Sequence, residues 1–427
     1  MVVATMERPA IAGGTPVRTA PLASIGDSSG RDVGDEELAQ LTEVIRSGAL
    51  NRNNGTKVQA LEAAWAERHG VRFATAATSG TAAIHVALGA LHLEPGDEVI
   101  TTPITDWGTV GPILAQNCVP VFADIDPRTY CLDPEQAAAA ITPRTRAIIA
   151  VHLMGQPCDM DAFLDLARRH NLYLIEDCAQ SHFATWRGQV VGSIGDIGCF
   201  SLQQSKVITT GDGGMTTTDD PELGMGLAFF QDKGWSRGRV IQGMRVYKRF
   251  GLNYRMTELQ GAVALAQLAK GDRLAEHRRK IAAHITAGIA DVPGVHPPYV
   301  APQAVSSYWH YMPSIDPEVL GVGGAEFARA VSAEGIGTGA GYAAALYLQD
   351  MFKRKQVFGT SHFPFDYGDR NLDDVDYSPG LCPVAEKLAD STRSNSMRLP
   401  CHEGITESDA DDMVTAISKV AHYFAER

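Results

Sequence analysis

Ser201-Leu-Gln-Gln-Ser-Lys206-Val-Ile-Thr-Thr-Gly-Asp-Gly-Gly214 joins the end of an apolar segment to a glycine-rich turn. Upstream, the apolar segment Leu172-Tyr-Leu-Ile-Glu-Asp177 ends in two acids. An acid at the end of one buried strand and a lysine just past another suit a cofactor that has a pyridine nitrogen and an aldehyde. Pyridoxal phosphate is that cofactor, because its lysine forms a Schiff base and a carboxylate holds the pyridinium proton. A lysine on a surface loop is the alternative that this pair of residues leaves open.

The length and composition indicate a globular protein of two domains. The chain has 427 residues, of which 44% are hydrophobic and 20% charged. This length exceeds one ordinary core, so two domains are expected. We expect a large cofactor-binding domain over 1–280, which includes an extended N-terminal arm over 1–30, and a smaller C-terminal domain over 281–427.

The net charge of −13 argues against binding to nucleic acid or to an anionic membrane, which would need a basic face. No segment has the roughly 20 uninterrupted apolar residues of a membrane span. The start of the chain lacks the apolar core of a signal peptide. The seven cysteines are scattered, without a Cys-x-x-Cys pair, which is typical of reduced thiols. We therefore expect a cytoplasmic protein with no structural metal.

Short β-rich segments alternate with amphipathic segments through the first half of the chain. This rhythm predicts an α/β fold with a mostly parallel central sheet flanked by helices, and a smaller C-terminal α/β domain. The predicted strands of the sheet are 99–102, 119–123, 147–152, 172–177, 198–202 and 215–218. Helices are expected at 35–47, 60–69, 81–91, 134–140, 160–170, 258–276, 325–334 and 408–424, with a further strand at 308–315.

Ser79-Gly80-Thr81 opens a predicted helix with small hydrogen-bonding residues. Free N–H groups, the positive end of the helix dipole and two hydroxyls make such a start a good phosphate cradle. Ser201, at the end of the strand before Lys206, could supply another hydroxyl to the phosphate. Plain capping of the helix by Ser79 or Thr81 is the alternative.

Three further residues could contact the same cofactor. Asp177 would pair with the ring nitrogen, and Gln180, three residues on, would project an amide toward the ring hydroxyl. Trp107 follows a predicted strand and could stack on the ring. An acidic strand end and a core tryptophan are the alternatives for Asp177 and Trp107. Asn253 precedes a predicted helix, and the residues alone are consistent with a cap of that helix.

A single cofactor accounts for these signals in their order along the chain: phosphate cradle, stacking ring, ring-nitrogen acid and Schiff-base lysine. A competing motif, Gly337-Thr-Gly339-Ala-Gly341-Tyr342, resembles a dinucleotide-binding loop. It lacks a clear preceding strand and the downstream acid, so we interpret it as a turn.

The whole chain resembles the DegT/DnrJ/EryC1/StrS sugar aminotransferases, which have the fold-type-I pyridoxal phosphate architecture. The matching blocks follow one another in order and are 13–18, 79–81, 151–157, 176–182, 195–201, 211–214 and 253–260. The resemblance implies a homodimer with shared active sites. It also implies that Asn253 reaches the phosphate of the neighbouring subunit's cofactor.

The residues just before the lysine bear on the acceptor. Many members of the family carry His-Pro where this chain has Gln203-Gln204, and the glutamine pair is similar to the glutamine:scyllo-inosose aminotransferases of aminoglycoside pathways. Some relatives replace the lysine by histidine and dehydrate sugars, and Lys206 argues against that chemistry. His182, Trp309 and Tyr342 are our candidates for shaping the acceptor pocket.

The predicted activity is a two-stage transamination. L-glutamine or L-glutamate donates the amino group, and the freed Lys206 amine is the general base that moves the proton from the donor's α-carbon. The acceptor would be a keto-cyclitol such as scyllo-inosose or 2-deoxy-scyllo-inosose, in aminoglycoside antibiotic biosynthesis. A nucleotide-linked keto sugar is the alternative acceptor. A non-catalytic cofactor-binding regulator is the alternative from another class.

Overall fold

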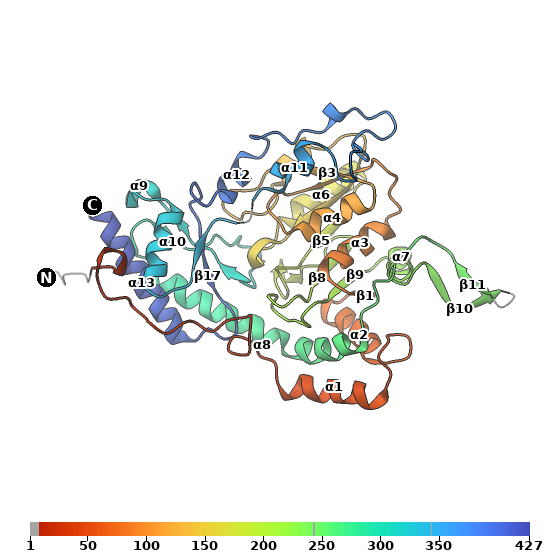
Figure 1. Cartoon of the computed structure of the whole chain (residues 1–427), viewed down its shortest axis with the longest axis horizontal. Helices are drawn as coiled ribbons and strands as arrows, with labels where there is room; N and C mark the ends of the chain where they lie inside the picture. Colours follow the sequence, from red (N-terminus) through yellow and green to blue (C-terminus); the bar gives the residue numbers. More distant parts are fainter. Residues whose placement is uncertain (1–7, 242–243, 343) are drawn as a thin grey trace.

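The computed structural model describes residues 8–241, 244–342 and 344–427. Its centre is a seven-stranded sheet with the strand order β1-β9-β8-β5-β4-β2-β3 (Figure 1). The strands are β1 (Phe73–Ala77), β2 (Glu98–Thr101), β3 (Val119–Phe122), β4 (Thr145–Val151), β5 (Tyr173–Asp177), β8 (Ile197–Ser201) and β9 (Gly214–Thr218). β2, β3, β4, β5 and β8 pair in parallel, whereas β9 is antiparallel to β8 and β1. The predicted α/β class with a mostly parallel sheet is confirmed.

Helices surround this sheet and continue into the C-terminal part of the chain. Those of the first part are α1 (Asp35–Ser47), α2 (Lys57–His69), α3 (Gly80–Ala90), α4 (Trp107–Ala115), α5 (Pro134–Ala139), α6 (Met160–His170), α7 (Pro221–Gln231) and α8 (Glu258–Gly288). Those that follow are α9 (Pro317–Leu320), α10 (Gly324–Ala333), α11 (Asp350–Lys353), α12 (Pro383–Ala389) and α13 (Glu407–Ala425). Each predicted helix overlaps one of these observed helices.

The sheet is covered on both faces because alternate residues of a strand point to opposite sides. On β8, Cys199 faces α3, where its thiol lies 3.7 Å from the carbonyl oxygen of Ala83. Its neighbour Phe200 packs on the other side, in an apolar cluster with Trp65 of α2 and Leu274 of α8. Apolar partners on both faces explain why these strands read as continuous apolar segments.

Two strand predictions need correction. β1 was not expected, because Phe73-Ala-Thr-Ala-Ala77 has few of the branched aliphatic residues that mark a buried strand. The single strand predicted over 308–315 is two short strands, β14 (His310–Tyr311) and β15 (Ser314–Ile315), which pair with different partners. Pro313 lies between them, and a proline has no N–H to donate to a sheet.

The C-terminal part has its own core between short strands and helices. β17 (Met397–Pro400) pairs with β14 and with β16 (Gly339–Ala340), and β12 (Val295–His296) pairs with β15. Its apolar core joins Phe327 of α10 to Ile417 of α13 and to Ile281 of α8. Residue 280 lies inside α8, which runs along both parts of the molecule in Figure 1, so the boundary near this residue stays a prediction.

Residues 345–388 leave this C-terminal part and return to the large sheet. Tyr347, Phe352 and Tyr377 are buried in the same cluster as Phe122 of β3. Arg370 forms an ion pair of 2.8 Å with Glu98 of β2, and both side chains are buried. The segment therefore covers the edge of the sheet at β3, although it lies within the residues predicted for the C-terminal domain.

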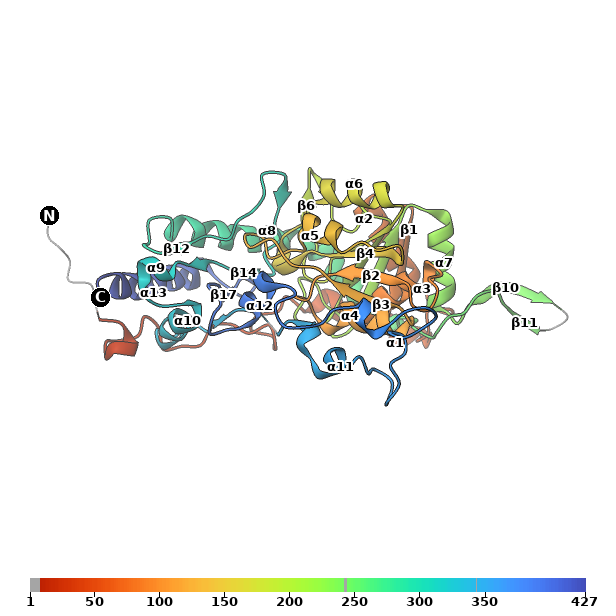
Figure 2. The same ribbon diagram turned by 90° about the horizontal axis from the view of Figure 1, so that it is seen from above.

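The ends of the described chain and a hairpin complete the architecture. The arm that begins at residue 8 packs against the C-terminal part, where Arg18 pairs with Asp409 of α13 at 2.7 Å. β10 (Trp235–Ile241) and β11 (Met244–Tyr247) form an antiparallel hairpin that projects away from the rest of the molecule (Figure 2). Three short strands, β6 (Thr185–Trp186), β7 (Gln189–Val190) and β13 (Ala304–Val305), form a small separate sheet.

We predict that Arg370→Met destabilises the protein by about 3–5 kcal/mol, because it leaves Glu98 charged and buried without its partner. Thermal and urea unfolding of the purified protein measure this effect. The matched control is Arg144→Met, which removes surface pairs with Asp369 at 3.2 Å and Asp374 at 3.3 Å and should cost less than about 1 kcal/mol. Equal losses in the two variants would contradict a structural role for the buried pair.

Candidate active site

A cavity of about 370 Å³ opens beside the carboxyl ends of β5 and β8. Crevices at the carboxyl ends of parallel strands are where open α/β sheets bind ligands. The residues that line it are Ser79, Gly80, Thr81, Ile84, Asp106, Gly108, Thr109, Asp177, Ala179, Ser201, Gln203, Ser205, Lys206, Asp212 and Trp309. The structure thus brings together Lys206, Asp177, Trp309, the Ser79–Thr81 turn and Ser201, which the sequence analysis selected from distant segments.

Lys206 lies on the loop that follows β8, with its ammonium nitrogen 4.3 Å from the centroid of the Trp309 ring. Trp309 is held in place by a hydrogen bond of 2.7 Å from its indole N–H to the carbonyl oxygen of Ser205. Burial lowers the pKa of Lys206 below its usual value, and the negative charges of Asp177 and Asp106 oppose that shift. A lowered pKa increases the fraction of neutral amine, the form that acts as nucleophile or base.

Asp177 ends β5, with one carboxylate oxygen 2.7 Å from the Thr109 hydroxyl and the other 3.0 Å from the backbone nitrogen of Ala179. Thr109 also shares a hydrogen bond of 2.6 Å with Thr105. Burial raises the pKa of Asp177, while these two donors favour the anion. A desolvated carboxylate with few donors is an environment that a cationic nitrogen would stabilise.

The start of α3 has the shape of an anion cradle. The Ser79 hydroxyl caps the helix by accepting a hydrogen bond of 3.0 Å from the Ala82 backbone nitrogen. A β-carbon on Gly80 would lie 2.6 Å from that of Ser201, and one on Gly214 would lie 2.2 Å from the Ser79 carbonyl oxygen. Both glycines are therefore required for the close approach of these segments. Ser79 caps the helix, and this is compatible with a role of the same helix start in binding phosphate.

Gln180 lies beside the cavity and connects two elements. Its side-chain oxygen accepts a hydrogen bond of 2.9 Å from the Met154 backbone nitrogen, and its amide nitrogen donates to the Tyr342 hydroxyl at 2.8 Å. Burial raises the pKa of Tyr342 to about 12, so its phenol stays neutral. Tyr342 belongs to the C-terminal part of the chain, and this contact joins that part to the end of β5.

Trp107 and His182 do not line the cavity, and neither do Gln180 and Tyr342. Trp107 is 40% exposed and lies in an adjoining apolar cavity with Ala115 and Phe358, because it is the first residue of α4 and projects outward. His182 is 1% exposed and packs against the rings of Trp65 and Phe200. The adjoining cavity shares Ser79 and Thr81 with the cavity of Lys206. Stacking of Trp107 on the cofactor ring and a role of His182 toward the acceptor both stay predictions.

Asn253 is exposed and lies outside the cavity. It does not cap the helix that follows, since Thr257 is the N-cap of α8 and its hydroxyl accepts from the Gln260 backbone nitrogen. The capping alternative for Asn253 is therefore wrong. A role toward a neighbouring subunit stays a prediction.

Asp106 and Thr109 are two polar residues of the cavity that sequence reasoning missed. Asp106 caps α4 by accepting a hydrogen bond of 2.8 Å from the Gly108 backbone nitrogen, and Thr109 binds Asp177. The signal for Asp106 was an acid that directly follows the strand end Thr101-Thr-Pro-Ile-Thr105. Thr109 gave no signal, because its contact with Asp177 depends on how α4 packs across the sheet.

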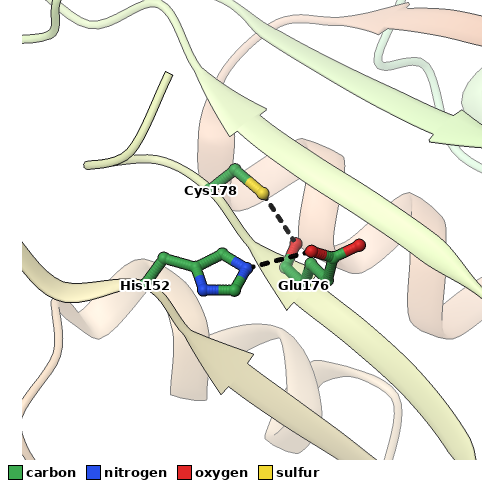
Figure 3. Close-up of side chains that lie close together, drawn as sticks. All are labelled: His152, Glu176 and Cys178. Carbon is green, nitrogen blue, oxygen red and sulfur yellow. Dashed lines mark hydrogen bonds and ion pairs between the residues drawn. The ribbon is translucent and has the colours of Figure 1, made fainter. Parts of the chain in front are cut away.

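A buried polar group behind the cavity holds the end of β5 (Figure 3). His152 and Glu176 form a hydrogen-bonded pair of 3.0 Å, and the other His152 ring nitrogen accepts from the Cys158 backbone nitrogen. Glu176 also accepts from the backbone nitrogens of Gly192, Ile194 and Gly195 at 2.7–2.8 Å. These contacts occupy the ligand atoms of both residues, so we interpret the group as structural.

The residues present fit pyridoxal phosphate. The cavity has a desolvated carboxylate for a cationic ring nitrogen and a lysine of lowered pKa for an aldehyde. It also has a helix start that glycine leaves open for a phosphate. The fold and the site together define a pyridoxal-phosphate-dependent transaminase.

Comparison with known proteins gives the family. Residues 31–418 match the DegT/DnrJ/EryC1/StrS aminotransferase family, and the chain belongs to it. A curated relative named putative L-glutamine:3-amino-2,3-dideoxy-scyllo-inosose aminotransferase, from Micromonospora echinospora, is 43% identical over 67% of this chain and 68% of its own. GDP-perosamine synthase from Caulobacter vibrioides is 35% identical over 86% of this chain and 90% of its own. The solved structure of an aminotransferase from Psychrobacter cryohalolentis matches with a TM-score of 0.82 and 30% identity, over 95% of this chain and all of the other.

No helix in the described part of the chain is both long and apolar enough to cross a membrane.

We predict that the Lys206 amine of the cofactor-free protein reacts with an amine-directed reagent at lower pH than an exposed lysine. Only the neutral amine reacts, so its rate rises with pH through the pKa, which burial lowers for Lys206. Mass spectrometry of each labelled lysine over a pH series measures this. The control is Lys280, whose pKa the contact with Glu407 raises. A half-maximal pH for Lys206 at or above that of Lys280 would contradict the site geometry.

Proposed function

We propose that this protein transfers the amino group of L-glutamine, or L-glutamate, to the ketone of a cyclitol such as scyllo-inosose or 2-deoxy-scyllo-inosose. The step would belong to aminoglycoside antibiotic biosynthesis. The observation that carries the catalytic part is the placement of Lys206, Asp177 and the start of α3 around one cavity. We further propose a homodimer with shared active sites that acts in the cytoplasm.

The residues selected from the sequence have the following proposed roles. Lys206 holds the cofactor covalently and, once displaced by the donor, takes the proton from the donor's α-carbon. Asp177 keeps the ring nitrogen protonated and Gln180 contacts the ring hydroxyl. The phosphate would be bound by Ser79, Gly80, Thr81 and Ser201, with Asn253 of a second subunit. When bound, pyridoxal phosphate supplies an aldehyde for the amine and a cationic ring that withdraws electrons.

The proton transfer depends on the environment of Lys206. Its pKa is lowered by burial, so a neutral amine is present to accept a proton near neutral pH. After accepting the proton, the ammonium is stabilised by the negative charges of Asp177 and Asp106. The same amine then returns the proton during the second half of the reaction, when the acceptor is aminated.

Asp106 supports a cyclitol acceptor. It lines the cavity with Lys206, and within the described residues only one of its carboxylate oxygens has a hydrogen-bond donor, the Gly108 backbone nitrogen. A free carboxylate oxygen accepts hydrogen bonds from the hydroxyls of a polyol. It would also attract the ammonium of an acceptor that already carries an amino group, as named for the Micromonospora echinospora relative. The same charge repels a diphosphate.

A nucleotide-linked keto sugar is the second candidate acceptor. GDP-perosamine synthase is a relative of similar identity. The apolar cavity that adjoins the proposed active site, with Trp107 and Phe358 among its lining residues, offers aromatic surface for a base. We prefer the cyclitol because of Asp106 and the Gln203-Gln204 pair. The chain belongs to an aminotransferase family, which argues against the regulator alternative.

Exposed apolar side chains support the proposed homodimer, and free cysteines support the proposed cytoplasmic location. The projecting hairpin and the residues after it expose Met244, Tyr247 and Phe250 at 64%, 57% and 71%. Exposed apolar side chains of this size support contact with a second copy. All seven cysteines are buried and free, which supports a reducing compartment.

We predict that the purified protein with pyridoxal phosphate aminates scyllo-inosose or 2-deoxy-scyllo-inosose with L-glutamine as donor, and that Lys206→Ala abolishes this activity. Product amines are measured by mass spectrometry, with a nucleotide-linked 4-keto sugar offered in parallel. Asp106→Asn should raise the KM for the cyclitol by about 10-fold, the loss of one charged hydrogen bond. Turnover of the nucleotide sugar alone would refute the cyclitol proposal, and turnover by Lys206→Ala would refute the mechanism.

We predict that two inactive variants restore activity when they share a dimer. In a heterodimer of Lys206→Ala and Asn253→Ala chains, one active site has Lys206 from one chain and Asn253 from the other. Random pairing should restore about one quarter of the wild-type activity. Co-expression with two affinity tags and an activity assay measures this. Asn253→Ala that is fully active alone, or a mixture without activity, would contradict the shared site.

A further inference from the structure

β17 presents Arg398 away from the core of the C-terminal part. Met397 and Leu399 on either side of it are fully buried in that core. Because successive side chains of a strand point to opposite faces, Arg398 points to the other face. The residues that pair across the sheet share this face: Gly339 of β16 lies opposite Arg398, and His310 of β14 lies opposite Pro400.

This face adjoins the cavity of Lys206. β14 is preceded directly by Trp309. The centroid of the Trp309 ring lies 4.3 Å from the Lys206 nitrogen and 4.6 Å from the centroid of the His310 ring. β16 is followed by Tyr342, which binds Gln180 at the end of β5. The two strands that flank Arg398 therefore both continue into residues at the proposed active site.

Arg398 has no ionic partner among the described residues. Its Nε atom is buried without a hydrogen bond. Two other arginines of this region differ, since Arg31 and Arg278 each form an ion pair of 2.8 Å with Glu403. The chain has a net charge of −13, so carboxylates that could pair with an arginine are abundant. A partly buried arginine that pairs with none of them in the described part of the chain indicates a binding site for an anionic ligand.

The surroundings of Arg398 favour a carboxylate as that ligand. Burial lowers the pKa of His310 to about 4, with the positive charge of Arg398 adding to the shift, so His310 is neutral. Tyr342 is also neutral, and Arg398 is among the charges that act on it. A planar guanidinium between neutral groups binds a carboxylate through two parallel hydrogen bonds.

We propose that Arg398 binds the α-carboxylate of the amino donor and orients its amine toward Lys206. An α-amino acid carries its carboxylate and its amine on the same carbon, so a donor that reacts at Lys206 must place its carboxylate close to this cavity. The proposal rests on the role of Lys206 given above and adds the residue that selects an α-amino acid as donor.

The test compares L-glutamine with 4-aminobutanamide, which is L-glutamine without the α-carboxylate. The readout is bleaching of the yellow cofactor absorbance of the holoenzyme, which needs the donor alone. For Arg398→Gln, we expect the half-saturating concentration of L-glutamine to rise by about 10- to 100-fold, as for loss of a charged hydrogen-bonded contact. The response to 4-aminobutanamide should be the same in wild type and variant.

Two further measurements separate binding from folding. Calorimetric titration with α-methyl-L-glutamine, which has no α-hydrogen and does not turn over, should show the same weakening in Arg398→Gln. Guanidinium ions should restore part of the L-glutamine response to Arg398→Ala. The matched control is Arg393→Gln, an exposed arginine shortly before β17, which should behave as wild type. Thermal unfolding verifies that each variant is folded.

Unchanged half-saturation by L-glutamine in Arg398→Gln would overturn the inference. A defect confined to amination of the ketone would also overturn it, because Arg398 would then contact the acceptor. A wild-type holoenzyme that no amino acid bleaches would instead contradict the proposed function itself, so the two failures are distinguishable.

Discussion

The end of β5 is the constraint on which the rest of the site depends. Glu176 and Asp177 are consecutive and point to opposite faces, and both carboxylates are buried. Burial favours a higher pKa for Glu176, yet His152 and the backbone N–H groups of Gly192 and Gly195 lower it below its usual value. Asp177 receives fewer donors, and burial raises its pKa. One carboxylate is thus fully used in holding the strand end, and the other remains available to a cationic ligand.

Desolvation is the common cause behind the chemistry of the cavity. It lowers the pKa of Lys206 and raises that of Asp177, because a buried site disfavours the charged form of both groups. A neutral amine and a carboxylate that gains from a cationic partner are the two properties that pyridoxal phosphate requires of its site. The cavity is therefore matched to the cofactor by burial and not only by the identity of two residues.

The C-terminal part of the chain contributes to the site along two routes. Trp309 and Tyr342 extend from short strands of that part to Lys206 and Gln180. Residues 345–388 return to the large sheet and place Phe358 beside Trp107 in the adjoining cavity. Under the proposals above, these segments contact the acceptor and the donor. Asp177 instead lies at the end of strand β5, and Lys206 lies on the loop that follows strand β8.

The sequence by itself determined the class of fold and the central residues of the site. Alternating strands and helices identified the parallel sheet, because buried parallel strands are continuous apolar runs, and the segments ending at Asp177 and preceding Lys206 marked the carboxyl edge. Local pattern could not place side chains that depend on packing. At the start of α4, Asp106 lines the cavity of Lys206 and Trp107 lines the adjoining one, which the sequence did not indicate. His182 was expected near the acceptor, yet it is buried among aromatic rings. Asp106 and Thr109 join Asp177 and Lys206 around the cavity only in three dimensions, because the segments that carry them are distant in sequence and are aligned by the sheet.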